Sequence, residues 1–366
     1  MNLLVLSRYD RQGASSRVRF LQYARHLQAV DLQPRLQSFF DGAYLSSLYA
    51  GQSTWASVLR AYRGRFVDLV RIPRNTDVIW LEKEALPWVP ALLELKLLPA
   101  STPLVSDFDD AVFHRYDLHH SGTVRKLLGR KFEQVMSRSA CVFAGNAYLE
   151  DYARVAGAAR VEIVPSVVDL DHYRMRGYAD DPSPPTVGWI GTPSTWRECA
   201  APYLPVLHGL LDVTSAPVMA VGARVDPGVE GNIRFVPWTE ETEIDQIRAM
   251  DIGIMPLPDT PWMRGKCGYK LIQYMACGLP VVASPVGVNA EIVEHGVNGF
   301  LAETPEEWAD ALRTLIRDPD LRRRMGRAGR KRVEERYSLQ VHGPRVAALL
   351  REIAERGAAA RVGRQD

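Results

Sequence analysis

The second half of the chain contains five short apolar runs, and their character restricts the fold more than any other feature of the sequence. Each run is continuously apolar instead of alternating with polar residues, and segments of helix length separate the runs. Strands that are apolar on both sides occur in parallel sheets covered by helices on both faces. The second half is therefore predicted to be a doubly wound α/β domain. The predicted strands lie at 187–191, 218–222, 233–238, 251–257 and 281–284.

The first half repeats this arrangement with weaker signals. An apolar strand at 3–6 leads into a polar turn that holds Gly13, and a helix is predicted from Arg17 to Ala29. A strand, a glycine-bearing loop and a helix in succession open an α/β unit, and such folds bind ligands at the carboxyl ends of their strands. Gly13 and Arg17 are therefore candidate ligand-binding residues, with simple helix capping by the nearby serines as the alternative. Further strands are predicted at 77–81, 103–106, 141–144 and 161–164.

The proline-rich segment at 180–185 is the clearest linker in the chain. A chain of 366 residues also suits two domains better than one. We predict domains at 1–170 and 184–338, followed by a helix at about 339–356. The last ten residues, from 357 on, are predicted to be disordered.

Charge and cysteine usage argue against several classes of function. A net charge of +2 is too small to indicate a nucleic-acid partner. Four scattered cysteines without a C-x-x-C pair fit a reducing cytoplasm and argue against a zinc site or a disulfide framework. No apolar run approaches the roughly 20 residues that span a bilayer, and the N-terminus has no leader pattern. A cytoplasmic location is expected.

The segment from Pro261 to Pro285 is the strongest candidate for a ligand site. A glycine-rich turn that carries Arg264 and Lys266 opens directly into an apolar-periodic helix, with Lys270 in its first turn. The open N–H groups of a helix start bind anions, whereas a cation there is mildly unfavourable unless an anion joins it. The pattern favours a phosphate site, and an ordinary surface turn is the alternative.

An acidic group follows the strand predicted at 103–106. Asp107 and Asp109 have a spacing that could hold a divalent metal through oxygen ligands, but capping of the next helix is the favoured interpretation. No metal site is predicted. A contact of Asp109 or Asp110 with a substrate hydroxyl stays open.

The first half is slightly basic, with 21 lysines and arginines against 17 aspartates and glutamates through Asp169. Several of these cations lie on a predicted amphipathic helix at 122–137, where Leu127 is expected inside and Lys131 outside. Five more arginines lie on a predicted helix within 52–74. Peripheral contact with the inner face of a membrane, or with a phosphorylated acceptor, is one hypothesis for this surface. A merely solvated face is the other.

At this point the residues show a family likeness. The run GYKLIQYMACGLPVVASPVGVNAEIVEHGVNGFL resembles the C-terminal signature of family 4 glycosyltransferases, which are retaining enzymes of the GT-B architecture. Looser matches are SSRVRF, AGNAYLEDYA, VPSVVDLDHY, VGWIG and IRDPDLRRRMGRAGRKRVEERYS. The resemblance implies two Rossmann-like doubly wound domains facing across a cleft, with the last helix returning to the first domain. It also implies a nucleotide-diphospho-sugar on the second domain and the acceptor on the first.

The same resemblance assigns roles to individual residues. The two glutamates of the family motif are replaced by Gly265 and Gln273, so the identity of the donor stays open, although a glutamine carbonyl can still accept from a ribose hydroxyl. Asp109 or Asp110 falls beside the reacting sugar. The implied donor contacts are Lys266 and Lys270 as phosphate cations, Gly191, Arg197, Trp238, Arg264, Gly265, Cys267, Gly268, Tyr269 and Gln273.

The predicted activity is transfer of a sugar from a nucleotide-diphospho-sugar to an acceptor hydroxyl with retention of configuration, in the biosynthesis of a surface glycan, a glycolipid or a glycosylated metabolite. No metal or other cofactor is expected, and UDP and GDP are not distinguished. The acceptor is expected to be a saccharide, a lipid-linked molecule or a small molecule. The alternatives are a nucleotide-sugar-binding GT-B protein without catalysis and a sugar-nucleotide epimerase.

Overall fold

The computed structural model describes residues 1–177, 184–224 and 233–362, which form two compact units. Unit 1 contains Met1–Ser166 together with the chain from His342 onward, and unit 2 contains Val167–Val341. Most of the predicted linker, residues 180–183, lies outside the described residues.

Residues 167–170, predicted for the first domain, belong to unit 2. The reason is a short bridge between Val168 and the end of the same unit. The Val168 N–H donates to the Tyr337 carbonyl (3.1 Å), and the Leu339 N–H donates to the Val168 carbonyl (2.8 Å). The chain therefore enters and leaves unit 2 at neighbouring points.

The sheet of unit 1 has six parallel strands in the order β2-β1-β3-β4-β5-β6. The chain runs outward from β1 to β2 and then returns to the other side of β1 with β3. In such sheets the crevice at this reversal, beyond the carboxyl ends of the strands, is where ligands bind. The strands are β1 (Asn2–Tyr9), β2 (Gln33–Phe40), β3 (Val78–Glu82), β4 (Leu104–Phe108), β5 (Cys141–Ala144) and β6 (Val161–Ile163).

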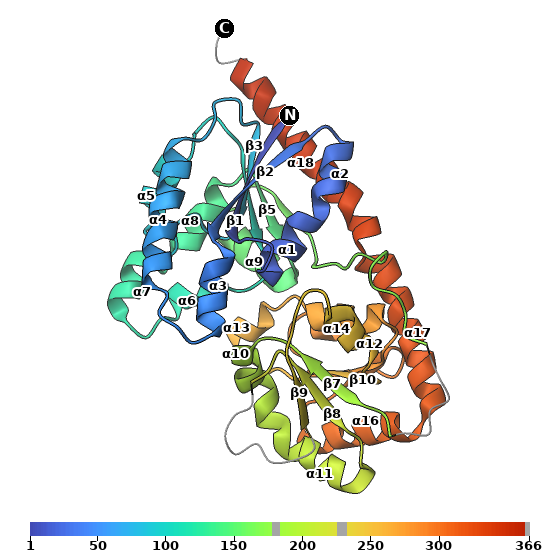
Figure 1. Ribbon diagram of the computed structural model, residues 1–366. Helices are drawn as coiled ribbons and strands as arrows, with labels where there is room; N and C mark the ends of the chain where they lie inside the picture. Colours follow the sequence, from blue (N-terminus) through green and yellow to red (C-terminus); the bar gives the residue numbers. More distant parts are fainter. Residues whose placement is uncertain (178–183, 225–232, 363–366) are drawn as a thin grey trace. The chain divides into compact units, whose positions relative to one another are not determined.

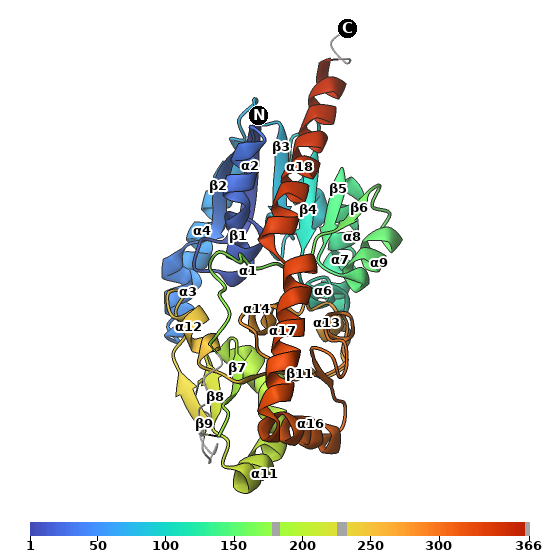
Figure 2. The same ribbon diagram turned by 90° about the vertical axis from the view of Figure 1, so that its right-hand side faces the viewer.

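Helices cover both faces of this sheet (Figure 1). One face packs on a core cluster that includes residues of α4, α5 and α8. The part of α18 in unit 1 runs lengthwise over the other face (Figure 2), where Val346 and Leu350 are buried. The helices are α1 (Ala14–Arg19), α2 (Ala24–Ala29), α3 (Gly42–Tyr49), α4 (Trp55–Val70), α5 (Ala91–Leu97), α6 (His114–Asp117), α7 (Gly122–Leu128), α8 (Lys131–Arg138), α9 (Ala147–Val155) and α18 (Leu339–Val362).

The sheet of unit 2 also has six parallel strands, in the order β12-β11-β10-β7-β8-β9. Its reversal lies between β7 and β10. The α/β class with doubly wound parallel sheets, predicted from the apolar runs, is thus confirmed in both units. The strands are β7 (Val187–Ile190), β8 (Val218–Val221), β9 (Ile233–Val236), β10 (Ile252–Met255), β11 (Val281–Ala283) and β12 (Gly299–Leu301).

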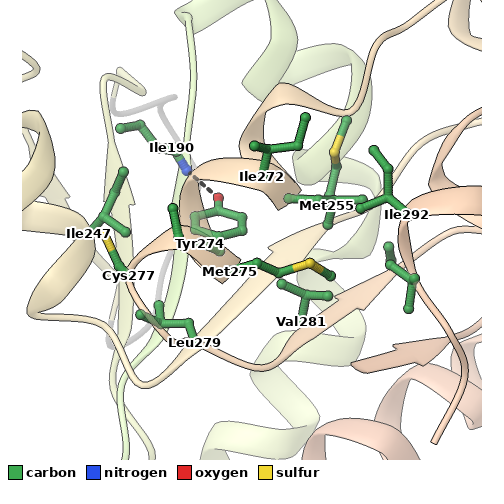
Figure 3. Packing of buried hydrophobic residues seen from close by; sticks show 14 of the residues in the cluster. Ile190, Ile247, Met255, Ile272, Tyr274, Met275, Cys277, Leu279, Val281 and Ile292 are labelled. Atoms are coloured by element: carbon green, nitrogen blue, oxygen red, sulfur yellow. Dashed lines mark hydrogen bonds between the residues drawn. The ribbon is translucent and has the colours of Figure 1, made fainter. Parts of the chain in front are cut away.

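Helix α14 is the central element on one face of this second sheet. Every residue from Leu271 to Ala276 is buried, so the helix is enclosed on all sides and not only along the predicted stripe. Gly278 (φ +80°) ends it in the left-handed conformation that such a position requires. Figure 3 shows Ile272, Tyr274 and Met275 within this core. The helices of the unit are α10 (Pro193–Thr195), α11 (Leu204–Thr214), α12 (Glu243–Arg248), α13 (Pro261–Arg264), α14 (Tyr269–Ala276), α15 (Asn289–Ile292), α16 (Pro305–Arg317) and α17 (Pro319–Arg336).

The predicted bounds of two helices and of the C-terminal tail were wrong. The helix predicted from Arg17 to Ala29 is two short helices joined by a 3₁₀ turn at Leu21–Tyr23, and the helix predicted at 122–137 breaks after Leu128. In the second case the predicted faces also failed, because Leu127 is 63% exposed and Lys131 is fully buried. The tail predicted to be disordered is helical as far as Val362, and residues 363–366 lie outside the described residues.

All four cysteines are free and buried. Burial raises the pKa of the Cys141 thiol and of the Cys277 thiol to about 12 in each case. Within the described residues, no helix has both the length and the apolar character needed to cross a membrane.

Candidate functional site

Unit 2 holds the predicted anion-binding helix against the reversal point of its sheet. The hydroxyl of Tyr274, in the second turn of α14, bonds to both strands that flank this point. It accepts from the Ile190 N–H (3.0 Å), at the end of β7 (Figure 3), and donates to the Ile254 carbonyl (3.4 Å) in β10. A tyrosine from the sequence motif therefore fixes α14 to the part of the sheet where ligands are expected.

Gly268 lets the chain enter α14 in a way that no other residue would allow. It is the N-cap residue and adopts φ +65°, which is strained for any residue with a side chain. A Cβ at this position would also lie only 2.3 Å from Cδ1 of Ile292 in α15. The first turn of α14, with its outward N–H groups, is thus packed tightly and held in place before any ligand arrives.

Lys270 lies over the end of β7. A Cβ on Gly191, the residue that follows β7, would be 2.9 Å from Cε of Lys270, so the lysine stem crosses directly above this glycine. The Lys270 ammonium is 5.4 Å from the ring centroid of the buried Trp189, a cation–π distance. Two of the predicted donor-site residues, Gly191 and Lys270, are therefore brought together at the reversal point.

Lys266 lies in the same region. Burial raises the pKa of the Cys199 thiol, and the ammonium groups of Lys270 and Lys266 both act in the opposite direction. Both cations therefore lie close enough to one buried thiol to influence it. The Lys266 ammonium is also 5.8 Å from the ring centroid of Trp262. The loop and the helix start thus gather two positive charges around the first turn of α14, which is the chemistry of an oxyanion or phosphate site.

A buried polar network connects two further predicted residues, Trp238 and Gln273. Glu243, the first residue of α12, accepts from Nε1 of Trp238 (2.7 Å), from the hydroxyl of Tyr173 (2.8 Å) and from Nε2 of Gln273 (2.9 Å). The same Gln273 nitrogen donates to the Tyr173 hydroxyl (2.8 Å). Because the network uses the amide nitrogen of Gln273, the carbonyl oxygen is the atom that can accept from a ligand.

Glu243→Gln should lower the free energy of unfolding of unit 2 by about 1–3 kcal/mol, because the new NH₂ group would face a buried donor that has lost its acceptor. Urea unfolding followed by tryptophan fluorescence measures the effect. The exposed Glu241→Gln, two residues away, is the matched control and should change stability by less than about 0.5 kcal/mol. Equal stabilities for the two variants would contradict the role given to Glu243.

The remaining predicted donor-site residues of unit 2 differ in how exposed they are. Arg264 is about half exposed and forms a two-pronged ion pair with Asp259 (2.6 and 2.9 Å). Arg197 is exposed on the turn after α10. Gly265 and Cys267 are buried within the loop, and Tyr269 is half-buried at the start of α14.

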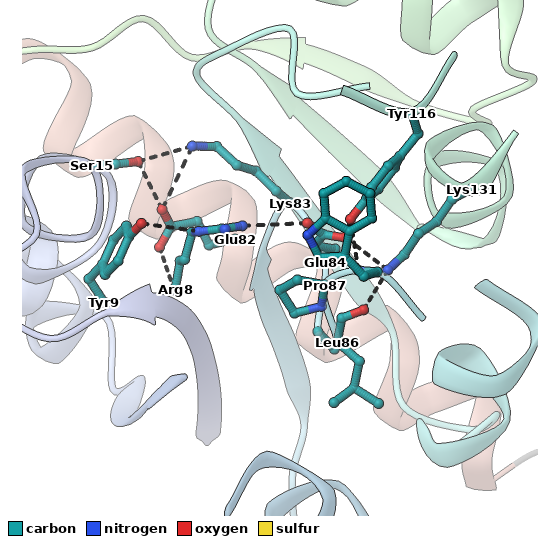
Figure 4. A network of polar contacts seen from close by, with 12 residues as sticks. Arg8, Tyr9, Ser15, Glu82, Lys83, Glu84, Leu86, Pro87, Tyr116 and Lys131 are labelled. Atoms are coloured by element: carbon teal, nitrogen blue, oxygen red, sulfur yellow. Dashed lines mark hydrogen bonds and ion pairs between the residues drawn. The ribbon is translucent and has the colours of Figure 1, made fainter. Parts of the chain in front are cut away.

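Unit 1 gathers a second polar cluster at its own reversal point, between β1 and β3 (Figure 4). Lys83, directly after β3, lies 2.6 Å from Asp109 Oδ1 and 3.8 Å from Glu82 Oε1. The Ser15 hydroxyl is 2.8 Å from Glu82 Oε1 and 2.8 Å from Asp109 Oδ2. Ser16 donates to Glu82 Oε2 (2.7 Å).

The cluster keeps Asp109 ionised. Burial alone would raise the pKa of this carboxyl, but the Lys83 ammonium, with further help from Arg19 and Ser15, lowers it to about 2. Asp109 is therefore an anionic hydrogen-bond acceptor at neutral pH and a poor general base. Asp107, for which capping of the next helix was the favoured interpretation, instead pairs with the buried Arg19 (2.8 Å).

Three other predicted residues of unit 1 border this cluster. Gly13 is the N-cap of α1, and a Cβ there would lie 2.3 Å from Cβ of Tyr9. Arg17 is half-buried on the same helix. Asp110 is half-buried. Burial lowers the pKa of Lys83, but the carboxylates of Asp109, Glu82 and, less strongly, Asp110 raise it above its ordinary value.

Sequence reasoning missed Lys83, Glu82, Glu243 and Tyr173. Lys83 and Glu82 carried a usable signal, because both come at the carboxyl end of a predicted strand, the same rule that singled out Gly191. Lys83 also adopts a left-handed backbone (φ +63°), which is strained for a lysine and common at functional sites. Glu243 and Tyr173 had no comparable signal, since they come from segments far apart in the chain.

Comparisons with known proteins show that the chain is similar to glycosyltransferases. Residues 212–318 match the family described as glycosyl transferases group 1. The chain is 29% identical over 143 residues to D-inositol 3-phosphate glycosyltransferase of Thermobispora bispora, covering 38% of this chain and 32% of that protein. It is 44% identical over 66 residues to human alpha-1,3/1,6-mannosyltransferase ALG2, covering 18% of this chain and 15% of that protein. The matched segments thus span about a third or less of these two curated relatives.

Solved structures extend the likeness to nearly the whole chain. Anabaena HepE in complex with UDP and glucose superposes with a TM-score of 0.71 at 19% identity, covering 96% of this chain and 99% of that one. WaaG, described as a glycosyltransferase of lipopolysaccharide biosynthesis, superposes with a TM-score of 0.66 at 13% identity over 96% and 99%. At these identities the likeness establishes the shared fold, which is the GT-B fold.

Proposed function

We propose that this chain, which has the GT-B fold and matches the group 1 glycosyltransferase family over residues 212–318, moves a sugar from a nucleotide-diphospho-sugar to an acceptor hydroxyl with retention of configuration. The donor is assigned to unit 2 and the acceptor to unit 1. The acceptor is a saccharide, a lipid-linked molecule or a small molecule, and peripheral contact with a membrane is part of the proposal.

One observation carries the proposal. Lys270 crosses directly above Gly191 at the reversal point of the unit 2 sheet, beside Lys266 and the amides of α14. Lys266 and Lys270 lie within the family match at 212–318, and Gly191 precedes it. Fixed cations and oriented amides suit a diphosphate, which gains negative charge when its bond to the sugar breaks. These groups supply that stabilisation without a metal or a protein nucleophile.

Trp238 and Gln273 are assigned to the nucleoside end of the donor. The indole N–H of Trp238 is already taken by Glu243, which orients the half-buried ring for contact with a base. The carbonyl oxygen of Gln273 is assigned to a ribose hydroxyl. The related fold of HepE has been solved with UDP and with UDP-glucose, which makes a uridine donor the first to test.

On the acceptor side, Asp109 is assigned to the hydroxyl that attacks the sugar. Its low pKa means that it orients this hydroxyl as a hydrogen-bond acceptor, while the proton passes to the departing phosphate. Lys83 holds Asp109 in place by their 2.6 Å ion pair.

A second candidate is a nucleotide-sugar-binding protein without transferase activity. The observation that favours it is the replacement of both motif glutamates, by Gly265 and Gln273. Loss of the first glutamate removes a contact to the transferred sugar, whereas the phosphate site is intact.

Titration with nucleotides followed by a donor assay separates the two candidates. UDP or GDP at about 100 times its Kd should add about 2.7 kcal/mol to the free energy of unfolding, measured as a thermal shift. Consumption of the matching sugar nucleotide, with transfer to an acceptor or to water, supports the enzyme. Binding without consumption supports the second candidate, and no stabilisation by any nucleoside diphosphate contradicts both.

A further inference from the structure

Helix α4 of unit 1 leaves large apolar side chains in solvent. Trp55 is 67% exposed, Leu59 60%, Phe66 53% and Val70 60%. These positions are spaced by four, seven and four residues, so they form one stripe roughly 60° wide along the helix. Scattered single apolar residues on a surface need no explanation, but four large apolar side chains aligned along one side of a helix are typical of an interaction surface.

The apolar stripe is bordered by arginines on one side. Arg60 and Arg63 project from the adjoining part of the exposed face, Arg71 caps the end of the helix, and Arg74 follows three residues later. All four are exposed. The opposite side of α4 packs inward through Leu69 and Arg65, so the stripe and its arginines cannot be turned toward the core of unit 1.

Among the described residues, few carboxylates lie near these four arginines. Asp41 lies 3.8 Å from Arg60, an exposed pair that contributes little. Asp68, the acidic residue within α4, is half-buried and accepts from the side chain of Gln37 (3.3 Å). The contacting helix α3 adds apolar area instead, with Leu48 45% exposed.

We propose that this face, defined by Trp55, Leu59, Phe66 and Val70 with Arg60, Arg63, Arg71 and Arg74, docks on an anionic lipid bilayer. A tryptophan at one end, an apolar stripe and flanking arginines match a helix that lies in the interface plane, with apolar side chains among the acyl chains and cations at the headgroups. A protein partner with an apolar groove would explain the stripe but not the four exposed arginines on the helix and just after it. The inference specifies the membrane contact in the proposed function, and it is tested without a donor or an acceptor.

Vesicle sedimentation of the full chain tests the proposal. Vesicles of phosphatidylcholine with 30% phosphatidylglycerol should bind the protein, and pure phosphatidylcholine should bind it at least tenfold more weakly. Trp55→Ser/Leu59→Ser should weaken binding to the anionic vesicles by at least about tenfold. Arg60→Gln/Arg63→Gln should weaken it by about tenfold or more and reduce its dependence on salt.

Matched controls remove similar groups from elsewhere on the surface. Val155→Ser deletes a 90% exposed apolar side chain at the end of α9, and Arg317→Gln/Lys331→Gln deletes two exposed charges from unit 2. Both should bind as the wild type does. The proposal is overturned if the wild type does not bind anionic vesicles at low salt, or if the control variants lose as much binding as the α4 variants do. It is also overturned if the α4 variants abolish only a self-association seen by analytical ultracentrifugation, because the face would then join two copies of this chain.

Discussion

Replacing Lys270 with methionine should lower kcat by about 100-fold or more once a donor and an acceptor are identified. The ammonium of Lys270 is the fixed cation above Gly191 at the reversal point of the unit 2 sheet. Loss of one preorganised group that stabilises a developing anion raises a reaction barrier by about 3–4 kcal/mol, which corresponds to two or three decades in rate. Initial rates of donor consumption at saturating donor measure the change.

Methionine is the informative substitution because the stem of Lys270 packs beside Trp189. Met keeps an unbranched side chain of similar length, so the packing is retained while the charge is removed. Lys270→Ala should lose at least as much activity, and Lys331→Met, at an exposed position on α17, should lose none. A Lys270→Met enzyme with turnover near that of the wild type would exclude Lys270 from the stabilisation of the leaving group.

Lys131→Met should lower the free energy of unfolding of unit 1 by about 3–5 kcal/mol. The ammonium is fully buried and contacts Glu84 Oε2 (2.8 Å), Glu94 Oε2 (3.0 Å) and the Leu86 carbonyl (2.6 Å), as Figure 4 shows in part. Both carboxylates are themselves buried, so removal of the lysine leaves Glu94 without its cation and leaves Glu84 with the longer ion pair to Arg8 (3.4 Å). Urea unfolding followed by circular dichroism measures the loss.

The stability difference between Lys131→Met and the wild type should also depend on pH. Burial already raises the pKa of Glu94, and Lys131 acts in the opposite direction, so the variant should raise this pKa further. A carboxyl with a higher pKa in the folded state than in the unfolded state takes up a proton on folding, and its cost falls as the pH falls. The stability deficit should therefore be smaller at pH 5 than at pH 8. Glu94→Gln should recover part of the loss when combined with Lys131→Met.

The exposed Lys126→Met on α7 is the control, since it removes the same charge from the other side of the helix break. It should change stability by less than about 0.5 kcal/mol. A Lys131→Met variant within 1 kcal/mol of the wild type would mean that water or a rearranged carboxylate replaces the lysine.

Lys131 also shows why the sequence alone did not predict which charged side chains are buried. The apolar periodicity that located the helix assigned Lys131 to solvent, because a lysine is expected outside unless a buried partner is known. The partners, Glu84 and Glu94, come from a loop and a helix about 40 residues earlier. Only the tertiary structure brings them together, and the same holds for Glu243 beside Gln273.

Strands that carry a continuous apolar run were predicted well from the local sequence. Strand β5 was predicted at its observed bounds, and the other buried strands were predicted to within a few residues. Strands β2 and β12 were missed for physical reasons. Strand β2 is an edge strand that reads QPRLQSFF, with only its last two residues buried, and β12 has only three residues. Neither offers the continuous apolar run on which the prediction rested.

In the predicted donor region, the sequence located the helix and the glycine that precedes it. It did not predict which residues the charged side chains pair with. The start of α14, Gly268 and Lys270 came from helix and glycine signals within one segment. Arg264, from the same loop, pairs with Asp259 five residues earlier, and nothing in the glycine-rich pattern indicated this competing carboxylate.

The buried state of all four cysteines makes this protein a convenient background for site-directed labelling. Thiol reagents attack the thiolate, which burial and a high pKa suppress at Cys141 and Cys277. A single cysteine introduced at the exposed position of Ala56 would then react selectively without removal of the native ones. A polarity-sensitive fluorophore attached there would report directly on the surroundings of α4 as lipid is added.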